Sequence, residues 1–441
     1  MFKRLKSSVL LMVLVTVVAL FFTASMGMSK RVVKVSNETY ESLKIFSDVL
    51  SLVEQSYPEV QKPKDLIYSS IKGMIHKLDP HSSFLTPDEY KEMKIDTKGV
   101  FGGIGIQISI KENVLTVIAP IEDTPAYRAG ILANDKIVKI GDKSTRDMTL
   151  DDAVRLMRGR KGTDVTIHIM RKGFEKPKPF TITRAIIKVK SVKFKPLEND
   201  IGYVRLSQFQ EKTSAELQKA LKKLSGKNKR LKGLVLDLRN NPGGLLQEAV
   251  NVSDFFLDSG VIVSTKGRND EQTMIFNADK TKTQPDYPMI VLVNGGSASA
   301  SEIVAGALQD HKRAVILGTA TFGKGSVQTI IPLADGSALR LTTARYYTPS
   351  GRSIQARGIE PDIVVEKGSR EHLKEKDLTG HLEAEKGPKK SKGSKKITIV
   401  EEKVKGEDGE DLQLKRAVDY LKSWYIFRGT TSGPDIMKKA G

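Results

Sequence analysis

The sequence predicts a multidomain protein with an α/β core, an inserted and mostly β module, and an N-terminal helical region. Three observations lead to this fold class. Apolar segments of strand length alternate with helical segments from residue 188 onward, short strands separated by turn residues fill 97–187, and apolar residues at helical spacing occupy 37–95. The 441 residues are enough for two or three domains, each with its own core.

The first 28 residues have the pattern of an export signal. Lys3, Arg4 and Lys6 precede an apolar run over 9–22, and small residues follow. The apolar run extended to residue 28 approaches the length that spans a bilayer, and no clean cleavage site follows it. Residues 1–28 are therefore either a cleaved signal peptide or an N-terminal membrane anchor formed by 9–28. In both cases we expect the rest of the protein to be exported to the periplasm or cell envelope.

Residues 29–96 are predicted to be helical. One helix carries an apolar stripe at helical spacing, formed by Leu43, Phe46, Leu50, Val53 and Tyr57. A second helix starts at a capping box, Thr86-Pro87-Asp88-Glu89, with proline at its first position. The stripe could pack on its own domain or pair with a second subunit.

Residues 97–187 alternate short strands with turns. Strands are expected over 104–110, 114–118, 136–140, 165–171 and 180–184, and one helix opens at Thr149 with Asp152 as its capping-box partner. Glycines before the first strand can direct backbone N–H groups into a shared hollow that suits a carboxylate. A peptide could then add as an extra strand in the groove between this strand and the helix. The segment that would bind the carboxylate is GGIGI: Gly102, Gly103, Ile104, Gly105 and Ile106.

The α/β core is predicted over 188–366. Strands over 201–206 and 233–238 alternate with helices over 213–224 and 245–257. The strand at 233–238 leads into the turn Arg239-Asn240-Asn241-Pro242-Gly243-Gly244, whose glycine amides have no partner in a regular element. The turn could therefore hold an anion, or it could be only a tight turn.

The most informative segment of the core is 289–328. An apolar strand from Met289 to Val293 stops at Asn294-Gly295-Gly296, and a helix-forming segment begins at Ser299. A hydroxyl group at a helix N-terminus lies beside unpaired N–H groups that can stabilise an anion, which is the environment a serine nucleophile needs. A second strand over 314–317 leads into a loop with Lys324 between two glycines.

Ser299 and Lys324 together suggest a nucleophile with a lysine as its general base. An exposed lysine has a pKa of roughly 10.4, so the site would have to lower this value by burying the amine. Gln328 lies four residues further along a predicted strand, on the face that carries Lys324, and its amide could orient the amine. A histidine base is the alternative. His311 would lie at the far end of the helix that Ser299 begins and could not reach, whereas His81 stays open.

The C-terminal part contains a charged segment and a helix. Residues 367–411 are rich in Lys, Glu, Gly and Ser and poor in apolar residues, which predicts a flexible charged linker. Residues 412–441 are expected to form a helix that docks on the core, followed by a loose tail.

The composition excludes several classes of function. The chain contains no cysteine, which excludes disulfides, a thiol nucleophile and thiolate metal sites. Its net charge is +20, but no nucleic-acid-binding motif is present and few aromatic residues lie among the basic ones. The six histidines are scattered and no metal-binding spacing occurs. We therefore expect no cofactor, no metal and no nucleic-acid partner.

Motifs along nearly the whole chain resemble one family, the carboxyl-terminal processing peptidases, which are PDZ-containing serine proteases with a Ser/Lys dyad. The motifs are NGGSASASEI and FGKGSVQ in the segment just described, LDPHSSFL (78–85), GGIGI (102–106), LDLRNNPGG (236–244) and SGRSIQARGIEPDIVV (350–365). The resemblance implies that 97–187 is a PDZ domain inserted before a crotonase-like core. It also implies Ser299 as nucleophile, Lys324 as general base and Gln328 as its orienting partner. An amide of Gly243 or Gly244 and the N–H of Ala300 would form the oxyanion hole, and dimerisation through the N-terminal helices becomes plausible.

The expected function is that of an exported serine endopeptidase. Its PDZ module would bind the free apolar C-terminus of a protein or peptide substrate and deliver the adjacent segment to Ser299. Two alternatives belong to other classes. A non-catalytic PDZ scaffold of the cell envelope would not need intact Ser299, Lys324 and Gln328, and an acyl-CoA enzyme on the same fold is disfavoured by the export signal.

Overall fold

The computed structural model of the protein describes residues 36–226, 231–269, 271, 273–366, 373–385, 399–400 and 411–431. The chain divides into two compact units, residues 1–71 and 72–441. The signal or anchor segment predicted over 1–28 lies outside the described residues. Within the described ranges, no helix combines the length and the apolar character needed to cross a membrane.

The first unit contains α2 (Asn37–Ser56), and α3 (Pro63–His76) begins in it. Ser36 caps α2 by accepting the backbone N–H of Thr39 at 3.2 Å. No residue of α2 is buried. Of its predicted apolar stripe, Leu43 and Phe46 are exposed, at 56% and 42%, whereas Leu50 and Val53 are half-buried. Among the residues that the structure describes, none buries this face of the helix.

Helix α4 (Pro87–Lys98) opens the connection to the β module. The predicted capping box is confirmed, because the Thr86 hydroxyl accepts the N–H of Glu89 and the Glu89 carboxylate accepts the N–H of Thr86. The helix ends at Gly99, whose φ of +64° favours glycine. Strand β2 (Val100–Gly103) then pairs antiparallel with β9 (Ala185–Lys188), so both ends of the module lie side by side.

The module itself has a six-stranded antiparallel sheet. The order is β3-β4-β5-β7-β8, and β6 pairs with β5. The capping box predicted at Thr149 and Asp152 is confirmed at the start of α6. The elements are β3 (Ile106–Lys111), β4 (Val114–Pro120), α5 (Pro125–Arg128), β5 (Lys136–Ile140), β6 (Lys143–Ser144), α6 (Leu150–Met157), β7 (Asp164–Met170) and β8 (Lys178–Thr183).

The core contains a seven-stranded sheet in the order β10-β11-β12-β15-β16-β19-β20, and all neighbours from β11 to β20 pair in parallel. Strands β12 and β15 are buried at every position, as central parallel strands are. The strands are β10 (Val192–Pro196), β11 (Ile201–Leu206), β12 (Gly233–Asp237), β15 (Met289–Val293), β16 (Val315–Gly318), β19 (Ile363–Val364) and β20 (Ile399–Val400).

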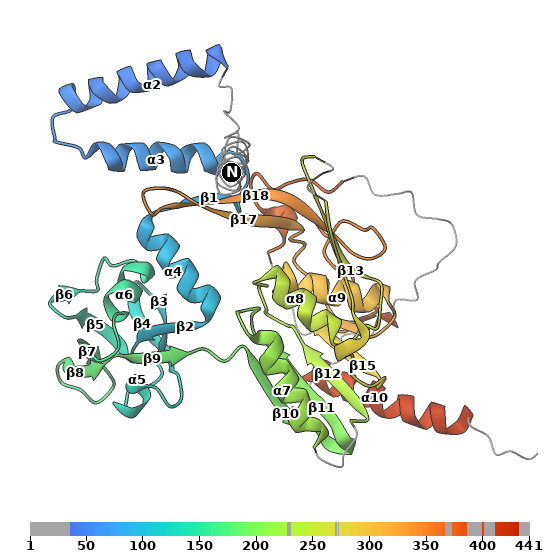
Figure 1. Cartoon of the computed structure of the whole chain (residues 1–441). Coiled ribbons are helices and arrows are strands. Elements are labelled where there is room, and N and C mark those ends of the chain that lie inside the picture. The colour runs from blue at the N-terminus through green and yellow to red at the C-terminus, as the bar shows by residue number, and fades with distance from the viewer. Residues whose placement is uncertain are drawn as a thin grey trace, which may run out of the picture. The chain divides into compact units, whose positions relative to one another are not determined.

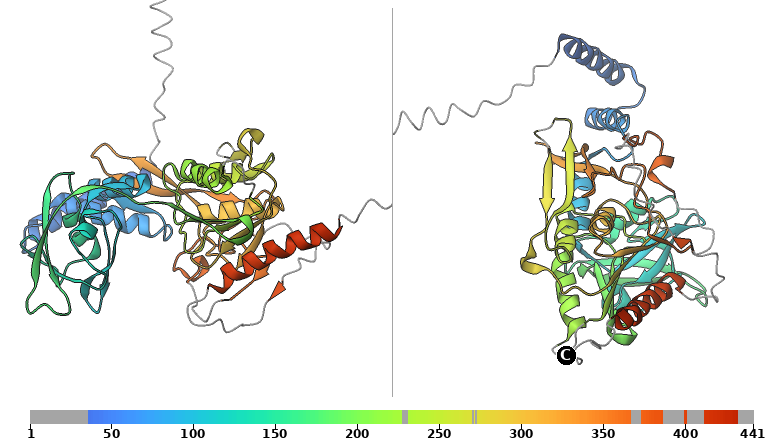
Figure 2. Two further views of the ribbon diagram at one scale, coloured as in Figure 1. Left: turned by 90° about the horizontal axis from the view of Figure 1, so that it is seen from below. Right: turned by 90° about the vertical axis from the view of Figure 1, so that its right-hand side faces the viewer.

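Helices cover both faces of this sheet (Figures 1 and 2). Helices α7 (Thr213–Ser225), α8 (Leu246–Asp254) and α9 (Ala300–Asp310) contribute to the larger apolar cluster. Helix α10 (Leu412–Thr431) places Ala417, Val418 and Leu421 in a second cluster with Val235 and Leu292 of the central strands. The C-terminal helix therefore docks on the sheet.

A second sheet of five antiparallel strands borders the first. Strand β18 (Ala338–Tyr347) pairs with β1 (Ser83–Leu85), β13 (Val261–Gly267) and β17 (Ser326–Pro332), and β13 pairs with β14 (Met274–Asn277). This sheet was not predicted from the sequence. Its consequence for the site is that β1, from the end of the N-terminal helical region, lies beside β18.

Part of the predicted charged linker is packed rather than solvated. In residues 373–385, Glu375 begins the short 3-10 helix η4 (Glu375–Asp377), and its side chain is fully buried. A charge that is buried must find partners, and Glu375 has them in His81 and Gln355. The rest of the predicted linker, apart from 399–400 and 411, lies outside the described residues.

Candidate active site

The serine corner is formed by the end of β15 and the start of α9. The chain leaves β15 at Val293, and the Ser297 hydroxyl fixes the turn by donating to the carbonyl of Leu238 at 2.8 Å. Ser299 is the N-cap of α9, with φ of +54° and ψ of −112° and only 9% of its surface exposed. A non-glycine residue rarely adopts this backbone conformation, so the corner is strained.

A buried carboxylate joins the serine corner to the lysine loop. One oxygen of Glu302 accepts the backbone N–H groups of Ser299 at 2.8 Å and of Lys324 at 2.9 Å. The other accepts the N–H of Gly323 at 2.7 Å and the hydroxyl of Thr321 at 2.5 Å. Burial raises the pKa of Glu302 to about 7, although the four hydrogen bonds act in the opposite direction. Glu302 thus ties the backbone of Ser299 to that of Lys324.

Lys324 has the electrostatic environment that a lysine base requires. Burial lowers the pKa of its amine, and the nearby Arg340 guanidinium acts in the same direction. The carboxylates of Glu375, Glu302 and Asp79 oppose this shift, but the net pKa stays below the ordinary value. A lowered pKa makes the neutral amine, which can accept a proton, more accessible near neutral pH.

Gln328 lies in β17 after a bulge between Val327 and Gln328. Its amide nitrogen donates to the hydroxyls of Thr342 at 2.8 Å and of Ser326 at 3.3 Å. Its amide oxygen is buried and accepts no hydrogen bond from the described residues. The side chain therefore keeps one unused acceptor, which is the group that could receive an N–H from a lysine amine.

The glycine turn after β12 packs directly against the serine corner. A Cβ atom on Gly243 would lie 2.9 Å from the Cβ of Ser299 and 3.0 Å from the nitrogen of Ala300, which leaves room only for glycine. The N–H of Gly243 donates to the side-chain oxygen of Asn241 at 2.9 Å. The N–H groups of Gly244 and Ala300 donate no hydrogen bond within the described part of the chain. These two amides could therefore bind an oxyanion.

The two histidines considered as bases occupy different places. The ring of His311 contacts the carbonyl of Val261 at 2.7 Å and lies at the far end of α9 from Ser299. The Nε2 atom of His81 lies 2.9 and 2.7 Å from the two carboxylate oxygens of Glu375. His81 is thus paired with a carboxylate whose negative charge also raises the pKa of Lys324.

In the GGIGI loop of the β module, two backbone carbonyls accept hydrogen bonds from within the module. The Ile104 carbonyl accepts the N–H of Ala126 at 2.9 Å, and the Gly105 carbonyl accepts the N–H of Ile121 at 2.9 Å and the hydroxyl of Thr124 at 3.0 Å. Among the described residues, nothing accepts the N–H groups of Ile104 and Gly105. The loop also contains Gly102, Gly103 and Ile106, at the end of β2 and the start of β3.

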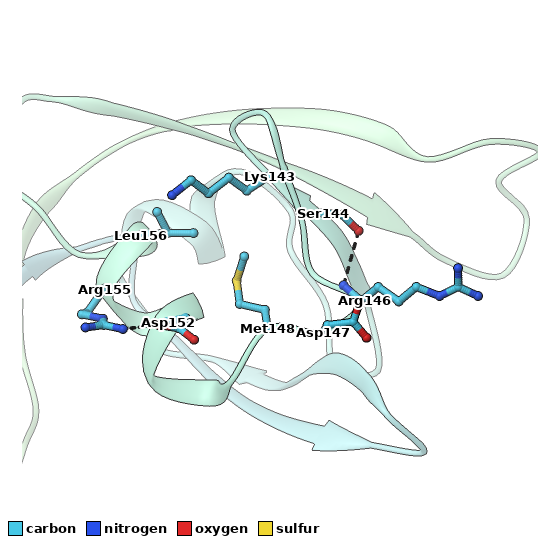
Figure 3. Close-up of a pocket in the computed structure, with 8 residues that line it drawn as sticks. All are labelled: Lys143, Ser144, Arg146, Asp147, Met148, Asp152, Arg155 and Leu156. Carbon is cyan, nitrogen blue, oxygen red and sulfur yellow. Dashed lines mark hydrogen bonds and ion pairs between the residues drawn. The ribbon is translucent and has the colours of Figure 1, made fainter. Parts of the chain in front are cut away.

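A pocket of about 460 Å³ lies elsewhere on this module, between β6 and α6 (Figure 3). It contains none of the GGIGI residues and is distant in sequence from Ser299. Its charges are mixed, and Arg155 is already paired with Asp152. Its lining is Lys143, Ser144, Arg146, Asp147, Met148, Asp152, Arg155 and Leu156. Size alone does not make this pocket the site of chemistry.

Two residues of the site were not singled out from the sequence. Glu302 lies three residues after Ser299, which is the capping-box spacing, and this spacing could have identified it. Glu375 lies in a segment of low complexity, where no local pattern distinguishes it from its neighbours. No group of three His, Asp or Glu side chains suited to a metal ion occurs in the ranges that the structure describes.

Comparison with known proteins identifies both parts of the chain. A model of peptidase family S41 matches residues 200–365, and a model of the PDZ domain matches residues 116–171. A carboxy-terminal-processing protease of Bartonella bacilliformis is 48% identical over 417 residues, which cover 92% of this chain and 94% of that protein. A probable CtpA-like serine protease of Staphylococcus aureus strain COL is 37% identical over 362 residues, covering 81% and 71% of the two chains.

Among solved structures, the photosystem II D1 C-terminal processing protease is 31% identical, covers 75% of this chain and 94% of its own, and has a TM-score of 0.45. The α/β core, the PDZ domain and the sequence relationships define a serine-type protease. This chain belongs to the carboxy-terminal-processing proteases of peptidase family S41.

Proposed function

We propose that this protease cleaves peptide bonds with a dyad of Ser299 and Lys324. The neutral amine of Lys324 takes the hydroxyl proton as the Ser299 oxygen attacks the carbonyl carbon. The resulting ammonium protonates the leaving amine when the C–N bond breaks. The acyl group is now bound to the Ser299 oxygen as an ester. A water molecule, deprotonated by Lys324, attacks this ester, and the Ser299 oxygen takes the proton back from Lys324 as the acyl group leaves. The observation that carries this proposal is the single oxygen of Glu302 that accepts the N–H groups of both residues.

Gln328 and the glycine turn have supporting roles in this proposal. The unused amide oxygen of Gln328 accepts an N–H of the Lys324 amine and orients its lone pair. The N–H groups of Ala300 and Gly244 bind the oxyanion, because the N–H of Gly243 is already donated to Asn241. Such donors act on charge that develops in the transition state, and each is worth on the order of 10²–10³ in rate.

The PDZ domain, we propose, binds the free C-terminus of the substrate. The unused N–H groups of Ile104 and Gly105 suit a carboxylate, and the adjacent β3 offers a strand edge to the peptide backbone. Gly102, Gly103 and Ile106 complete this loop. An apolar terminal residue suits the edge of β3, where Ile106 and Ile108 are partly buried.

We also propose that the protein is exported and that it has six segments. The charged start and the apolar residues 9–28 direct the protein to the periplasm or cell envelope, as a cleaved signal or as an anchor. The proposed boundaries are 1–28 signal or anchor, 29–96 helical region, 97–187 PDZ domain, 188–366 crotonase-like catalytic core, 367–411 linker and 412–441 C-terminal helix and tail.

A homodimer through the N-terminal helices is the proposed assembly. The apolar stripe of α2 contains no buried residue, and its members Leu43 and Phe46 are exposed. A dimer measured by light scattering should therefore become a monomer when residues 30–95 are deleted. A wild-type monomer at micromolar concentration would contradict the proposal.

The dyad is tested with protein lacking residues 1–28 and a substrate that ends in a free apolar C-terminus. Ser299→Ala and Lys324→Ala should both abolish cleavage, and an amidated substrate terminus should weaken binding through the PDZ domain. Cleavage that survives Lys324→Ala would move the base to His81. Absence of cleavage by the wild-type protein would favour the scaffold alternative.

A further inference from the structure

The lysine loop is held from a second side by a residue outside the region that the peptidase model matches. The backbone N–H of Glu375 donates to the carbonyl of Phe322 at 3.1 Å. The amide nitrogen of Gln355 donates to the Glu375 carboxylate at 2.9 Å, and its amide oxygen accepts the N–H of Gly325 at 3.0 Å. Glu375 therefore reaches the loop on both sides of Lys324.

His81 completes this arrangement from the other end of the chain. Its Nε2 atom lies 2.9 and 2.7 Å from the two oxygens of Glu375, and its side chain is 17% exposed. The turn that bears His81 is itself fixed, because Asp79 accepts the N–H groups of His81 and Ser82, both at 2.8 Å. This turn leads into β1, which pairs with β18.

The charges around Lys324 come from four elements. The carboxylates of Glu375 in η4, Glu302 in α9 and Asp79 before β1 favour its ammonium form, whereas Arg340 in β18 disfavours it. Burial is the largest influence and disfavours the ammonium, so the net pKa of Lys324 is lowered. Of the three carboxylates, Glu375 has the largest effect.

Glu375 carries its charge although it is buried. Burial would raise the pKa of its carboxyl group, but the hydrogen bonds from His81 and Gln355, together with the positive charge of Lys324, lower it. A carboxylate with two side-chain donors is satisfied without an ion pair to the lysine amine. Glu375 can therefore influence the Lys324 amine through its charge without forming a hydrogen bond to it, so the lone pair of the neutral amine stays available.

We propose that Glu375, held by His81 and Gln355, is a positioning residue that fixes the Lys324 loop and sets how readily the amine loses its proton. The proposal rests on the proposed function, in which Lys324 is the general base. Glu375 touches neither substrate nor the reacting atoms, so it is not a catalytic residue. In this arrangement His81 serves as a donor to Glu375 and not as the base.

The first test compares Glu375→Gln with wild-type full-length protein in detergent. Glutamine keeps the shape and an acceptor but removes the charge that favours the ammonium, so the pKa of Lys324 should fall. The acidic limb of the profile of kcat/KM against pH should then move to lower pH, by about one unit. Glu385→Gln is the matched control, because Glu385 lies in the same segment and binds Arg345 and Tyr347 instead. An unmoved limb, or an equal shift in the control, would overturn the proposal.

The second test does not depend on protease activity. The pH dependence of Lys324 acylation by acetic anhydride, followed by mass spectrometry, reports the pKa of the amine directly. Glu375→Gln should lower that pKa even if Lys324 proves not to be the base. An unchanged pKa would refute the role of Glu375, whereas a changed pKa with activity surviving Lys324→Ala would refute only the proposed dyad.

The third test separates positioning by His81 from proton transfer by His81. His81→Ala removes the donor to Glu375 and should lower kcat about tenfold with little change in KM. His81→Gln restores an N–H donor and should recover most of this loss. If His81→Gln were as inactive as Ser299→Ala, His81 would be the base and the proposal would be wrong.

Discussion

Ser299 adopts a backbone conformation that costs stability. At φ of +54° and ψ of −112°, a side chain of the L configuration is disfavoured by about 1–3 kcal/mol. Two contacts hold it there: the N–H of Ser299 donates to Glu302, and Gly243 packs against its Cβ. Backbone strain of this kind occurs preferentially at functional sites, which fits the role proposed for Ser299.

This strain predicts an unusual order of stability at position 299. Ser299→Gly should be more stable than Ser299→Ala by about 1 kcal/mol, because glycine adopts positive φ without a steric penalty. Both variants should be inactive. Urea unfolding measures the difference in free energy. Ser301 is the control, since it lies inside α9, where glycine should be less stable than alanine. The same order at both positions would contradict the strain.

Glu302→Gln should damage both activity and stability. The new NH₂ group must face N–H donors on one side, so at least one buried donor loses its acceptor, at a cost of about 1–3 kcal/mol. Because the positions of Ser299 and Lys324 depend on this carboxylate, kcat should fall about 100-fold. A kcat close to that of the wild type would show that the link is dispensable.

The same variant should lose a pH dependence of stability. The folded-state pKa of Glu302, about 7, exceeds its ordinary value of 4.5, so the folded protein binds more protons between these values. The contribution of Glu302 to stability is therefore full below the ordinary pKa and decreases as pH rises through about 7. The stability deficit of Glu302→Gln should be larger near pH 5 than near pH 8. Unfolding free energies at both pH values test this; a constant deficit would argue against a raised pKa.

At the scale of elements, the sequence predicted those helices, strands and turns that are determined by neighbouring residues. Strand β15, the Asn-Gly-Gly stop and helix α9 follow from consecutive residues, and so Ser299 was identifiable as a helix N-cap. The second sheet was not, because β18 pairs Arg340 with Ser83 across more than half of the chain, and alternating residues do not name a distant partner. Glu375 was missed for the same reason: its burial depends on His81 and Gln355, not on its neighbours.

Helix α10 is connected to the glycine turn by a buried arginine. Arg239, at the start of that turn, donates to both oxygens of Asp411 at 2.7 Å and to Gln413 at 3.0 Å. Its Nε and Nη2 atoms also donate to Asp237 at the end of β12, at 3.0 and 2.7 Å. A bidentate pair of this kind fixes direction as well as distance. The C-terminal helix therefore supports the segment that presents Gly244.

Asp411→Asn should weaken this support. Asparagine loses one acceptor and the charge, and because Asp411 is partly exposed the loss of stability should be only about 1 kcal/mol. The proposed oxyanion donors should be displaced, and kcat/KM should then be lower by about tenfold. Asp419→Asn, within α10, is the control. Equal kinetics of the two variants would show that α10 only covers the sheet.

At the scale of the whole molecule, the lowered pKa of Lys324, which suits the proposed general base, also reduces the stability of the fold. Lys324 is partly buried, and its lowered pKa means that protonating it costs more free energy in the folded state than in the unfolded chain. The folded protein binds fewer protons than the unfolded chain between the lowered pKa and the ordinary value of 10.5. Stability from this group therefore rises as pH increases through that range.

Lys324→Met should separate the two properties. Methionine is similar in length and carries no charge, so at neutral pH it removes the cost of a buried ammonium and should raise the free energy of unfolding while abolishing cleavage. The gain should shrink as pH rises through the range between the lowered pKa and 10.5, because the wild-type amine becomes neutral in the folded protein first and is neutral in both states only above 10.5. Lys222→Met, at an exposed position of α7, controls for added apolar surface. If Lys324→Met is less stable than the wild type at neutral pH, the contacts of the Lys324 side chain stabilise the fold by more than the desolvation of its amine destabilises it. The lowered pKa of Lys324 would then not reduce the stability of the protein.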